Sequence, residues 1–544
     1  SGGGLIGLIT SNSFLEASLL SGLRYHSLRD FGLNIVDLHG YSQGQANDAD
    51  GDENVFDVLE GVAIHFGQHF KTQSANGVYI SSIRGLREGK FERLLSSGVP
   101  SGAKVAAKAP NYLFTMPSSS PHAVYEDWAY LETIMPLVRG AIVTARDSFV
   151  IGQTAAELEA RLHYFRDSRD ALEEKSTRVG ARWSGSWANE GKAVSAQATI
   201  RSMQQHQISS AIARIAYRPF DFRFLFYVDD FLDTPARAVM GSMLQTDALG
   251  LSLGKSTRNP SVEHFLAVDG PVEAKCTEST KQCHLAPLWI KPSAGESHRR
   301  PNIDRAWALD FGKALGLAYE DGIPRGEHKS FGPDFQRQKA EQLGLLDTPW
   351  DGRGDLQRTF GPRDLFDYTY AVLHSPGYRS RYAEFLKSDF PRISTPATRI
   401  TFAALAALGR QLVGLHLLRP EDAVVLKSPN IQFRGSGEAR VAKGYPDYQN
   451  GKVMINASRW FEDVPKATWE FHVGGYQVCE KWLKDRAGKG GQNPSPGRVL
   501  TEDDILHYRR VVTALTETRR LMAEIDAVID QNGGWPGAFV TDVA

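Results

Sequence analysis

The sequence predicts a multidomain protein that combines α/β and α+β parts. Its length of 544 residues suggests about three domains, at roughly 100–200 residues per domain. Near the N-terminus, apolar runs typical of strands alternate with a helical pattern, whereas long helical patterns dominate toward the C-terminus. We therefore expect a partial α/β sheet first, then a mixed α/β region with a helical C-terminal part.

The N-terminal region is expected to form a β-α-β unit followed by a further strand. Residues 5–10 and 33–38 are apolar runs, and residues 55–66 form a third strand region. Leucines recur with helical spacing across residues 14–28. This order is typical of the last part of an α/β sheet. A domain rarely begins on a central strand, so we expect the chain to start inside a domain.

Apolar patterns and capping residues also predict strands and helices in the rest of the chain. Aromatic and β-branched runs predict strands between residues 217 and 253. The clearest helix starts at Thr501, whose hydroxyl can cap the backbone, with Asp504 three residues later. Apolar positions then line one helical face from Ile505 to Ile529. Further helices are expected at residues 158–165, 171–175, 366–373, 378–386 and 402–418.

Composition and charge limit the class of protein. A formal net charge of −1 excludes a wholly basic, histone-like binder, but it allows a groove in which Arg and Lys are concentrated. Three cysteines without paired spacing form neither a disulfide framework nor a zinc site, which favours a reducing compartment. The most apolar stretch, residues 402–418, is shorter than the ~20 residues of a membrane span. With no signal peptide visible, we expect a cytoplasmic protein without a membrane partner.

Two glycine-rich motifs fail the physical test for nucleotide binding. Residues 2–7 satisfy G-x-G-x-x-G, but a strand follows where a helix N-terminus is needed. Residues 250–256 approach a P-loop, but the first glycine lies one residue too close to the Gly-Lys pair. The sequence also shows no convincing metal-ligand spacing, so neither a nucleotide site nor a metal site is expected.

Two N-terminal blocks resemble the last motifs of the γ class of N6-adenine DNA methyltransferases. They are residues 7–15 (GLITSNSFL) and residues 54–66 (NVFDVLEGVAIHF). In that class these strands follow the catalytic [N/D/S]PP[Y/F/W] loop and precede the target-recognition domain. The resemblance implies that Phe56 stacks on an adenine flipped out of the duplex, which offsets the lost base stacking. The alternative is that Phe56 is a core residue of a strand.

Further blocks narrow the resemblance to Type ISP restriction–modification enzymes. Each block alone is moderately specific for this family. Their shared order along nearly the whole chain is strongly specific for it. The blocks are residues 140–147 (GAIVTARD), 217–223 (YRPFDFR), 370–379 (YAVLHSPGYR), 382–393 (YAEFLKSDFPRI), 474–478 (GGYQV) and 481–486 (KWLKDR). The first departs from the family's GIxTxRD by one extra residue after the glycine. The resemblance implies the C-terminal part of such an enzyme.

The resemblance also implies where the domains lie in this chain and which functions belong to the rest of the full-length enzyme. Residues 1–75 would end the methyltransferase domain, residues 76–212 would form a connecting and N-terminal recognition region, and residues 213–544 would form the target-recognition domain. No Pro-Pro dipeptide, FxGxG strand motif or P-loop occurs in the sequence. We therefore assign no catalytic or cofactor-binding residue here and expect the chain alone to be inactive. S-adenosylmethionine, the nuclease and the ATPase would belong to the full-length enzyme, whose partner is double-stranded DNA.

Basic residues in and near these blocks are the candidates for DNA contact. Arginine can fork onto guanine O6 and N7, whereas lysine binds phosphates as a point charge. A structural alternative stays open: an arginine beside Asp221 can form an ion pair, and a tyrosine after two glycines can pack in a tight turn. The candidates are Arg218, Arg223, Lys255, Arg258, Arg379, Arg381, Lys387 and Tyr476.

Two other interpretations remain at this point. The chain could be a separate DNA-specificity subunit that docks on a catalytic partner chain. It could also be an unrelated soluble enzyme that uses His374 or Cys479, although no nucleophile–base–orienter set can be traced in the sequence.

Overall fold

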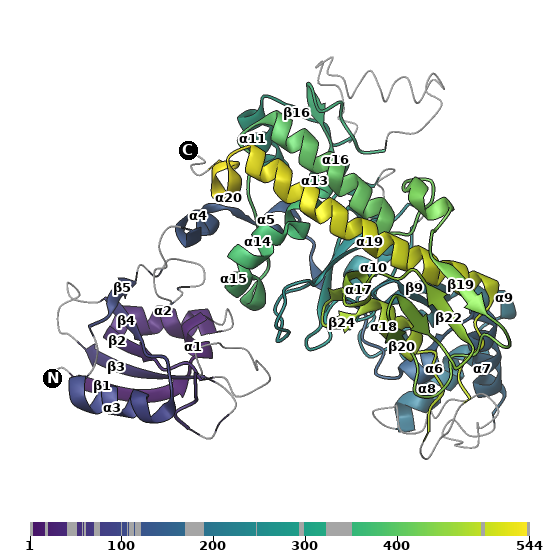
Figure 1. Ribbon diagram of the computed structural model, residues 1–544, viewed down its shortest axis with the longest axis horizontal. Helices are drawn as coiled ribbons and strands as arrows, with labels where there is room; N and C mark the ends of the chain where they lie inside the picture. The colour runs from purple at the N-terminus through teal and green to yellow at the C-terminus, as the bar shows by residue number, and fades with distance from the viewer. Residues whose placement is uncertain are drawn as a thin grey trace. The chain divides into compact units, whose positions relative to one another are not determined.

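The computed structural model divides into two compact units, residues Ser1–Glu126 and Asp127–Ala544, which are described separately (Figure 1). It describes residues 4–16, 20–40, 52–56, 58, 61–69, 77–98, 101–105, 107, 112, 114, 121–168, 190–245, 247–292, 299–322, 351–490 and 496–540. The helix expected at residues 171–175 lies outside these ranges. The three-part division expected from the sequence stays a prediction.

The first unit contains a mixed five-stranded sheet in the order β1-β3-β2-β4-β5. Its strands are β1 (Gly4–Ser11), β2 (Gly32–Asp37), β3 (Val62–His69), β4 (Val78–Ser82) and β5 (Ala103–Val105). β3 runs antiparallel to both β1 and β2, so β1 and β2 are parallel to each other. Helices α1 (Ser13–Glu16) and α2 (Ser21–Asp30) connect that parallel pair, and α3 (Arg87–Ser97) follows β4.

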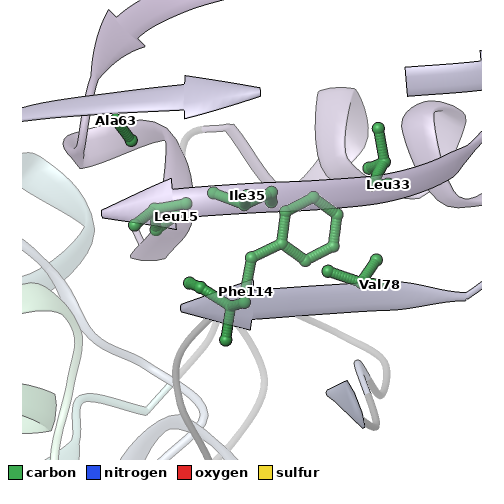
Figure 2. Close-up of a cluster of buried hydrophobic side chains, with 7 residues drawn as sticks. Leu15, Leu33, Ile35, Ala63, Val78 and Phe114 are labelled. Atoms are coloured by element: carbon green, nitrogen blue, oxygen red, sulfur yellow. The ribbon is translucent and has the colours of Figure 1, made fainter. Parts of the chain in front are cut away.

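Two apolar clusters hold this sheet, one on each face, as alternation along the strands requires. In the first cluster, the Phe114 ring lies beside Ile35 and Val78, and Leu15 reaches the sheet from α1 (Figure 2). The second gathers Val36, Leu38, Val55, Val62 and Ile83. The edge strand β1 stands apart, because its apolar side chains are largely exposed.

The N-terminal elements differ from expectation at two places. The helix expected over residues 14–28 is divided between α1 and α2. The third strand begins at Val62 rather than at residue 55, because the preceding segment forms a bend. In that bend, Asn54 Oδ1 accepts a hydrogen bond from the Phe56 N–H, and Asn54 Nδ2 donates to the Gly40 and Val58 carbonyls. A side chain that bonds neighbouring backbone in this way replaces the strand ladder with a turn.

The second unit contains several small sheets. The larger ones have the orders β8-β10-β9, β12-β11-β13-β7 and β19-β22-β21-β20. Their strands are β7 (Arg139–Gly140), β8 (Ile151–Gly152), β9 (Ile212–Arg218), β10 (Asp221–Phe226), β11 (Gly250–Gly254), β12 (Phe265–Val268), β13 (Cys283–Pro287), β19 (Gln432–Gly435), β20 (Asp447–Gln449), β21 (Lys452–Met454) and β22 (Arg459–Glu462). Short pairs join β6 (Ala129–Tyr130) to β18 (Arg392–Ile393), β14 (Trp289–Ile290) to β15 (Arg300–Pro301), β16 (Ala318–Tyr319) to β17 (Thr359–Phe360), and β23 (His472–Val473) to β24 (Tyr476–Gln477).

Three long helices, α13 (Pro362–His374), α16 (Arg399–His416) and α19 (Glu502–Gln531), pack against one another in the second unit (Figure 1). Thr501 caps α19 as expected: its hydroxyl accepts from the Asp504 N–H at 3.1 Å, and Asp504 bonds back to the Thr501 N–H. Gly409 lets α16 approach α13 closely, because a Cβ there would lie 1.8 Å from the Asp367 carbonyl oxygen. The helical C-terminal part expected from the sequence is confirmed.

The other described helices of residues 121–540 are no longer than α13. They are α4 (Pro121–Asp127), α5 (Leu131–Ile134), α6 (Asp147–Val150), α7 (Ala155–Asp167), α8 (Glu190–Ser202), α9 (Gln205–Ser210), α10 (Arg237–Met243), α11 (Arg305–Leu315), α14 (Pro376–Arg381), α15 (Ala383–Ser388), α17 (Lys466–Trp469), α18 (Val478–Lys484) and α20 (Gly534–Gly537). The helix expected over residues 378–386 is broken at Tyr382, whose backbone leaves the helical region and whose ring packs edge-on against Trp128. The structure is thus a mixed α/β multidomain protein, and among its described helices none is long and apolar enough to cross a membrane.

Candidate nucleic-acid interface

The YRPFDFR block forms a buried ionic network rather than an open basic surface. Asp221, 1% exposed, accepts hydrogen bonds from Arg223 and Arg486, both at 2.8 Å. Burial alone would raise the pKa of Asp221, but the two arginines outweigh burial and hold the pKa below its ordinary value. Arg218 pairs with Glu273, and only 12% of the Arg218 side chain is exposed. The ion-pair alternative therefore describes Arg218 and Arg223.

Two further candidates are also packed into the second unit. The Tyr476 hydroxyl donates to the Lys275 carbonyl at 2.9 Å, and its ring centroid lies 5.8 Å from the Arg218 guanidinium and 5.9 Å from Lys481 Nζ. Arg379 is 6% exposed, and its Nε donates to the Leu373 carbonyl at 2.6 Å. Burial lowers the pKa of Arg379. Neither side chain lies open on the surface.

The other four candidates are more accessible, and the structure brings three of them together. The Thr257 N–H donates to the Lys387 carbonyl at 3.0 Å, which joins the segment after β11 to the end of α15. Lys255, with 39% of its side chain exposed, lies 3.6 Å from Asp389, and Lys387 bonds Glu384 at 3.2 Å. Arg258 is exposed and directly follows Thr257, whose N–H bonds the Lys387 carbonyl. Arg381, also exposed, ends the neighbouring helix α14.

Three segments meet at these cations, two of them near each other in the sequence and the third much later. We call them the recognition loops: residues 255–261 after β11, residues 275–282 before β13, and the β23–β24 turn at residues 474–475. The Ser279 N–H donates to the Gly474 carbonyl at 2.9 Å, and the Gly474 N–H donates to the Glu263 carbonyl at 2.8 Å. The recognition loops thus form one connected surface rather than three independent ones.

Sequence reasoning identified the Gly474-Gly475 pair but not what it contacts. Both glycines have positive φ, +58° and +84°, a conformation that L side chains rarely adopt. A Cβ on Gly474 would lie 1.9 Å from the Thr277 carbonyl oxygen, and one on Gly475 would lie 2.4 Å from Asn259 Oδ1. The pair is therefore required for the close approach of the third recognition loop to the other two.

The recognition loops carry the donors and acceptors that sequence reasoning missed. Asn259, Glu278, Ser279 and Thr280 bond one another across the first two loops. Hydroxyl, amide and guanidinium groups are the groups that hydrogen-bond base edges and phosphates. No motif signals this set, since its members share no local spacing and meet only through the fold.

In the first unit, Phe56 lies on the surface. Its side chain is 41% exposed, so it is not a core residue of a strand. A buried anchor holds the segment that precedes it: Lys90 Nζ donates to the Leu38 carbonyl at 2.7 Å, the Glu53 carbonyl at 2.5 Å and Asp52 Oδ1 at 2.8 Å. Asp52 also accepts from two backbone N–H groups, at 2.8 Å each. An exposed aromatic ring is thus presented from a fixed bend.

The described residues offer no catalytic set around His374 or Cys479. His374 is buried and its Nδ1 bonds the Tyr370 carbonyl at 2.8 Å, while burial holds its pKa well below the ordinary value. Burial raises the pKa of the Cys479 thiol to about 12. A thiol that stays protonated and an inaccessible imidazole supply neither nucleophile nor base. Within the same described ranges, no group of three or more His, Cys, Asp or Glu residues could hold a metal ion.

Fold and site together define a mixed α/β recognition domain. Residues 133–524 match the family described as the Type ISP C-terminal specificity domain, and the chain belongs to this family.

Solved structures share the fold. The DrdV–DNA complex superposes with a TM-score of 0.60 at 19% identity, over 96% of this chain and 50% of that one. A nuclease-deletion mutant of the Type ISP restriction–modification enzyme LlaGI, solved with a DNA substrate mimic, gives a TM-score of 0.58 at 17% identity, over 96% of this chain and 39% of that one. The chain therefore spans half or less of the length of these proteins.

A curated relative is also similar over a limited region. A 5'-nucleotidase of Vibrio parahaemolyticus serotype O3:K6 (strain RIMD 2210633) is 25% identical over 212 residues, which is 37% of this chain and 32% of that protein. A similarity of this extent does not define a second family.

Proposed function

We propose that this chain is the DNA-recognition part of a Type ISP restriction–modification enzyme that methylates adenine N6. The family match over residues 133–524 carries the proposal. In the full-length enzyme, S-adenosylmethionine would supply the methyl group to an adenine extruded from the duplex. The recognition loops, with the cations beside them, would contact double-stranded DNA.

The topology of the first unit supports its proposed role as the end of a Rossmann-like methyltransferase sheet. The parallel strands β1 and β2, joined through α1 and α2, form a β-α-β unit. Leu5 is 85% exposed and Ile9 is 59% exposed on the edge strand β1. Since exposed apolar edge strands pair readily, we propose that a strand of the preceding methyltransferase part covers β1. That part can be linked covalently or belong to a partner chain.

The described residues at the carboxyl ends of β1 and β2 bond one another rather than forming an open site for the cofactor. At the carboxyl ends of β1 and β2, where α/β sheets bind ligands, Asn12 Nδ2 lies 3.4 Å from Asp37 Oδ1 and His39 Nδ1 lies 3.3 Å from Asp37 Oδ2. These groups satisfy one another, so no residue here is assigned to S-adenosylmethionine. The nuclease, the ATPase and a cytoplasmic location stay predictions that follow from the family resemblance.

The DNA-facing cations proposed here are Lys255, Arg258, Arg381 and Lys387. Their side chains are accessible; Lys255 and Arg258 belong to the first recognition loop, and Lys387 contacts that loop. The other candidates, the buried Arg379 and the partly buried Arg218, Arg223 and Tyr476, would instead support this surface, since their polar groups bond other residues of the second unit.

DNA binding by the 544-residue chain should weaken steeply as salt rises. Each phosphate contact contributes about −0.9 to the slope of log K against log salt concentration. The Lys387→Ala variant is expected to make that slope shallower by about 0.9, the contribution of one phosphate contact, and to leave the sequence preference unchanged. Fluorescence anisotropy with a labelled duplex across a salt series measures both. Lys313→Ala, an exposed lysine on α11, is the control and should match the wild type. A salt-independent affinity would contradict the proposal.

Loss of the Phe56 ring should impair base extrusion in the full-length enzyme. Base–aromatic stacking contributes about 1–3 kcal/mol per base, so Phe56→Ala should shift the extrusion equilibrium about 5- to 150-fold toward the stacked base. Fluorescence of 2-aminopurine at the target adenine reports extrusion directly. Phe91→Ala removes a similarly exposed ring, 42% against 41%, from α3 and should leave the signal unchanged. Equal signals from Phe56→Ala and the wild type would remove Phe56 from the site.

A further inference from the structure

Glu278 is a buried carboxylate that organises two of the recognition loops. Its side chain is 0% exposed. It accepts hydrogen bonds from the Thr280 N–H at 2.6 Å, the Thr280 hydroxyl at 2.5 Å and the Lys281 N–H at 3.2 Å. Both of its oxygens also accept from Asn259 Nδ2, at 3.2 and 3.1 Å. A buried charge is tolerated only when it is well hydrogen-bonded, so this set fixes the position of Asn259 relative to residues 280–281.

The backbone on both sides of Arg258 is fixed by the same arrangement. The Arg258 N–H donates to the Thr280 hydroxyl at 3.1 Å, and Thr280 is in turn held by Glu278. The preceding Thr257 N–H is bonded to the Lys387 carbonyl. The following Asn259 N–H donates to the Thr257 hydroxyl at 3.0 Å. The Cα of Arg258 therefore has a defined position although its side chain is exposed.

The cations near Arg258 differ from it in two respects. Lys255 and Lys387 already face carboxylates, Asp389 and Glu384. As lysines they also present point charges, which suit phosphate oxygens. Arg258 instead projects a planar guanidinium from a rigid backbone into solvent. A guanidinium can donate two parallel hydrogen bonds to guanine O6 and N7, which is the commonest base-specific contact in the major groove.

We propose that Arg258 is a specificity-determining residue that recognises one guanine of the DNA target, and that Glu278 is the positioning residue that holds its backbone. Glu278 does not touch DNA in this arrangement; it acts through Asn259 and Thr280. The flanking lysines supply affinity that does not depend on sequence. The inference rests on the proposed function, because it assigns a role within the same DNA-binding surface.

Selection of duplexes from a library with a randomised central segment tests both residues in the 544-residue chain. The wild type should prefer guanine at one position, and Arg258→Gln should reduce that preference about 5- to 150-fold while preferences elsewhere persist. Glu278→Gln should relax the same position. It should leave the salt slope of binding unchanged, because the number of surface cations is the same. Arg410→Gln, an exposed arginine on α16, is the control and should select the wild-type sequence.

The outcomes separate this inference from the proposed function. A wild-type chain that selects no sequence overturns the proposed function itself. A wild type that selects a sequence which Arg258→Gln selects equally well overturns the role of Arg258. Uniform weakening at all positions in Arg258→Gln also overturns it, since that pattern marks a phosphate contact. Glu278→Gln tests the positioning role if its thermal unfolding matches that of the wild type. If it does not match, Asn259→Ala, which removes the bonds from Asn259 to Glu278, is used instead. Unaltered sequence selection by the variant used overturns the positioning role.

Discussion

The Asp221→Asn variant is expected to lose about 3–5 kcal/mol of the free energy of unfolding of the second unit. Asp221 is 1% exposed and bonds two guanidinium groups, those of Arg223 and Arg486. Asparagine keeps the shape of the side chain but removes its charge, which leaves both cations without their shared buried partner. Breaking a buried ionic group in this way costs far more than forming it contributes.

Urea denaturation of the 544-residue chain, followed by circular dichroism, measures this loss as a lower midpoint for the larger unit. Asp229→Asn is the matched control. Asp229 pairs with Arg237 on the surface, where the two side chains are 46% and 70% exposed, so solvent already screens the pair. A midpoint for Asp221→Asn that coincides with that of Asp229→Asn would show that the network around Asp221 contributes little to folding.

The Lys90→Met variant is expected to unfold the segment that carries Phe56 and to lower the stability of the first unit by about 3–5 kcal/mol. Methionine fills the space of the lysine stem but donates nothing to Asp52 or to the Leu38 and Glu53 carbonyls. All three acceptors would lose their common donor, and each lost bond adds a desolvation cost, although Asp52 would still accept from the Gly40 and Gly85 N–H groups.

Hydrogen exchange at residues 52–56 is the direct measurement, with thermal unfolding as the second. Protection of these amides should fall in Lys90→Met and persist in Lys104→Met, which replaces an exposed lysine on β5. In the full-length enzyme, Lys90→Met should also reduce 2-aminopurine fluorescence, because a mobile Phe56 loses its preorganisation. Unaltered exchange in Lys90→Met would mean that Asn54 alone holds the bend.

Local signals in the sequence predicted much of the fold. Thr501 and Asp504 form the cap of α19 within one helical turn, so the sequence alone predicts it. Strand β2 follows from a short apolar run. The bend at Phe56 was not predicted, because residues 55–66 are apolar enough to suggest one strand and the decisive bonds come from Asn54 and Lys90.

The candidate site could be predicted only in part, and the reason is geometric. Sequence blocks identify arginines but not the direction in which they point, so Arg379 and Arg381 were treated alike although the first is buried and the second exposed. Glu278 and Asn259 carry no motif, and Gly475 lies far from both in the sequence. Their relation arises from tertiary contacts that no local pattern encodes.

The linkage among the recognition loops constrains how this protein can acquire a new target. Exchanging residues 255–261 alone for those of another homologue would remove the two bonds from Asn259 to the buried Glu278 carboxylate and would change the side chain that Gly475 contacts. Successful reprogramming should therefore require all three segments to be transplanted together, whereas a point change at the outward-facing Arg258 could alter the preferred base without such compensation.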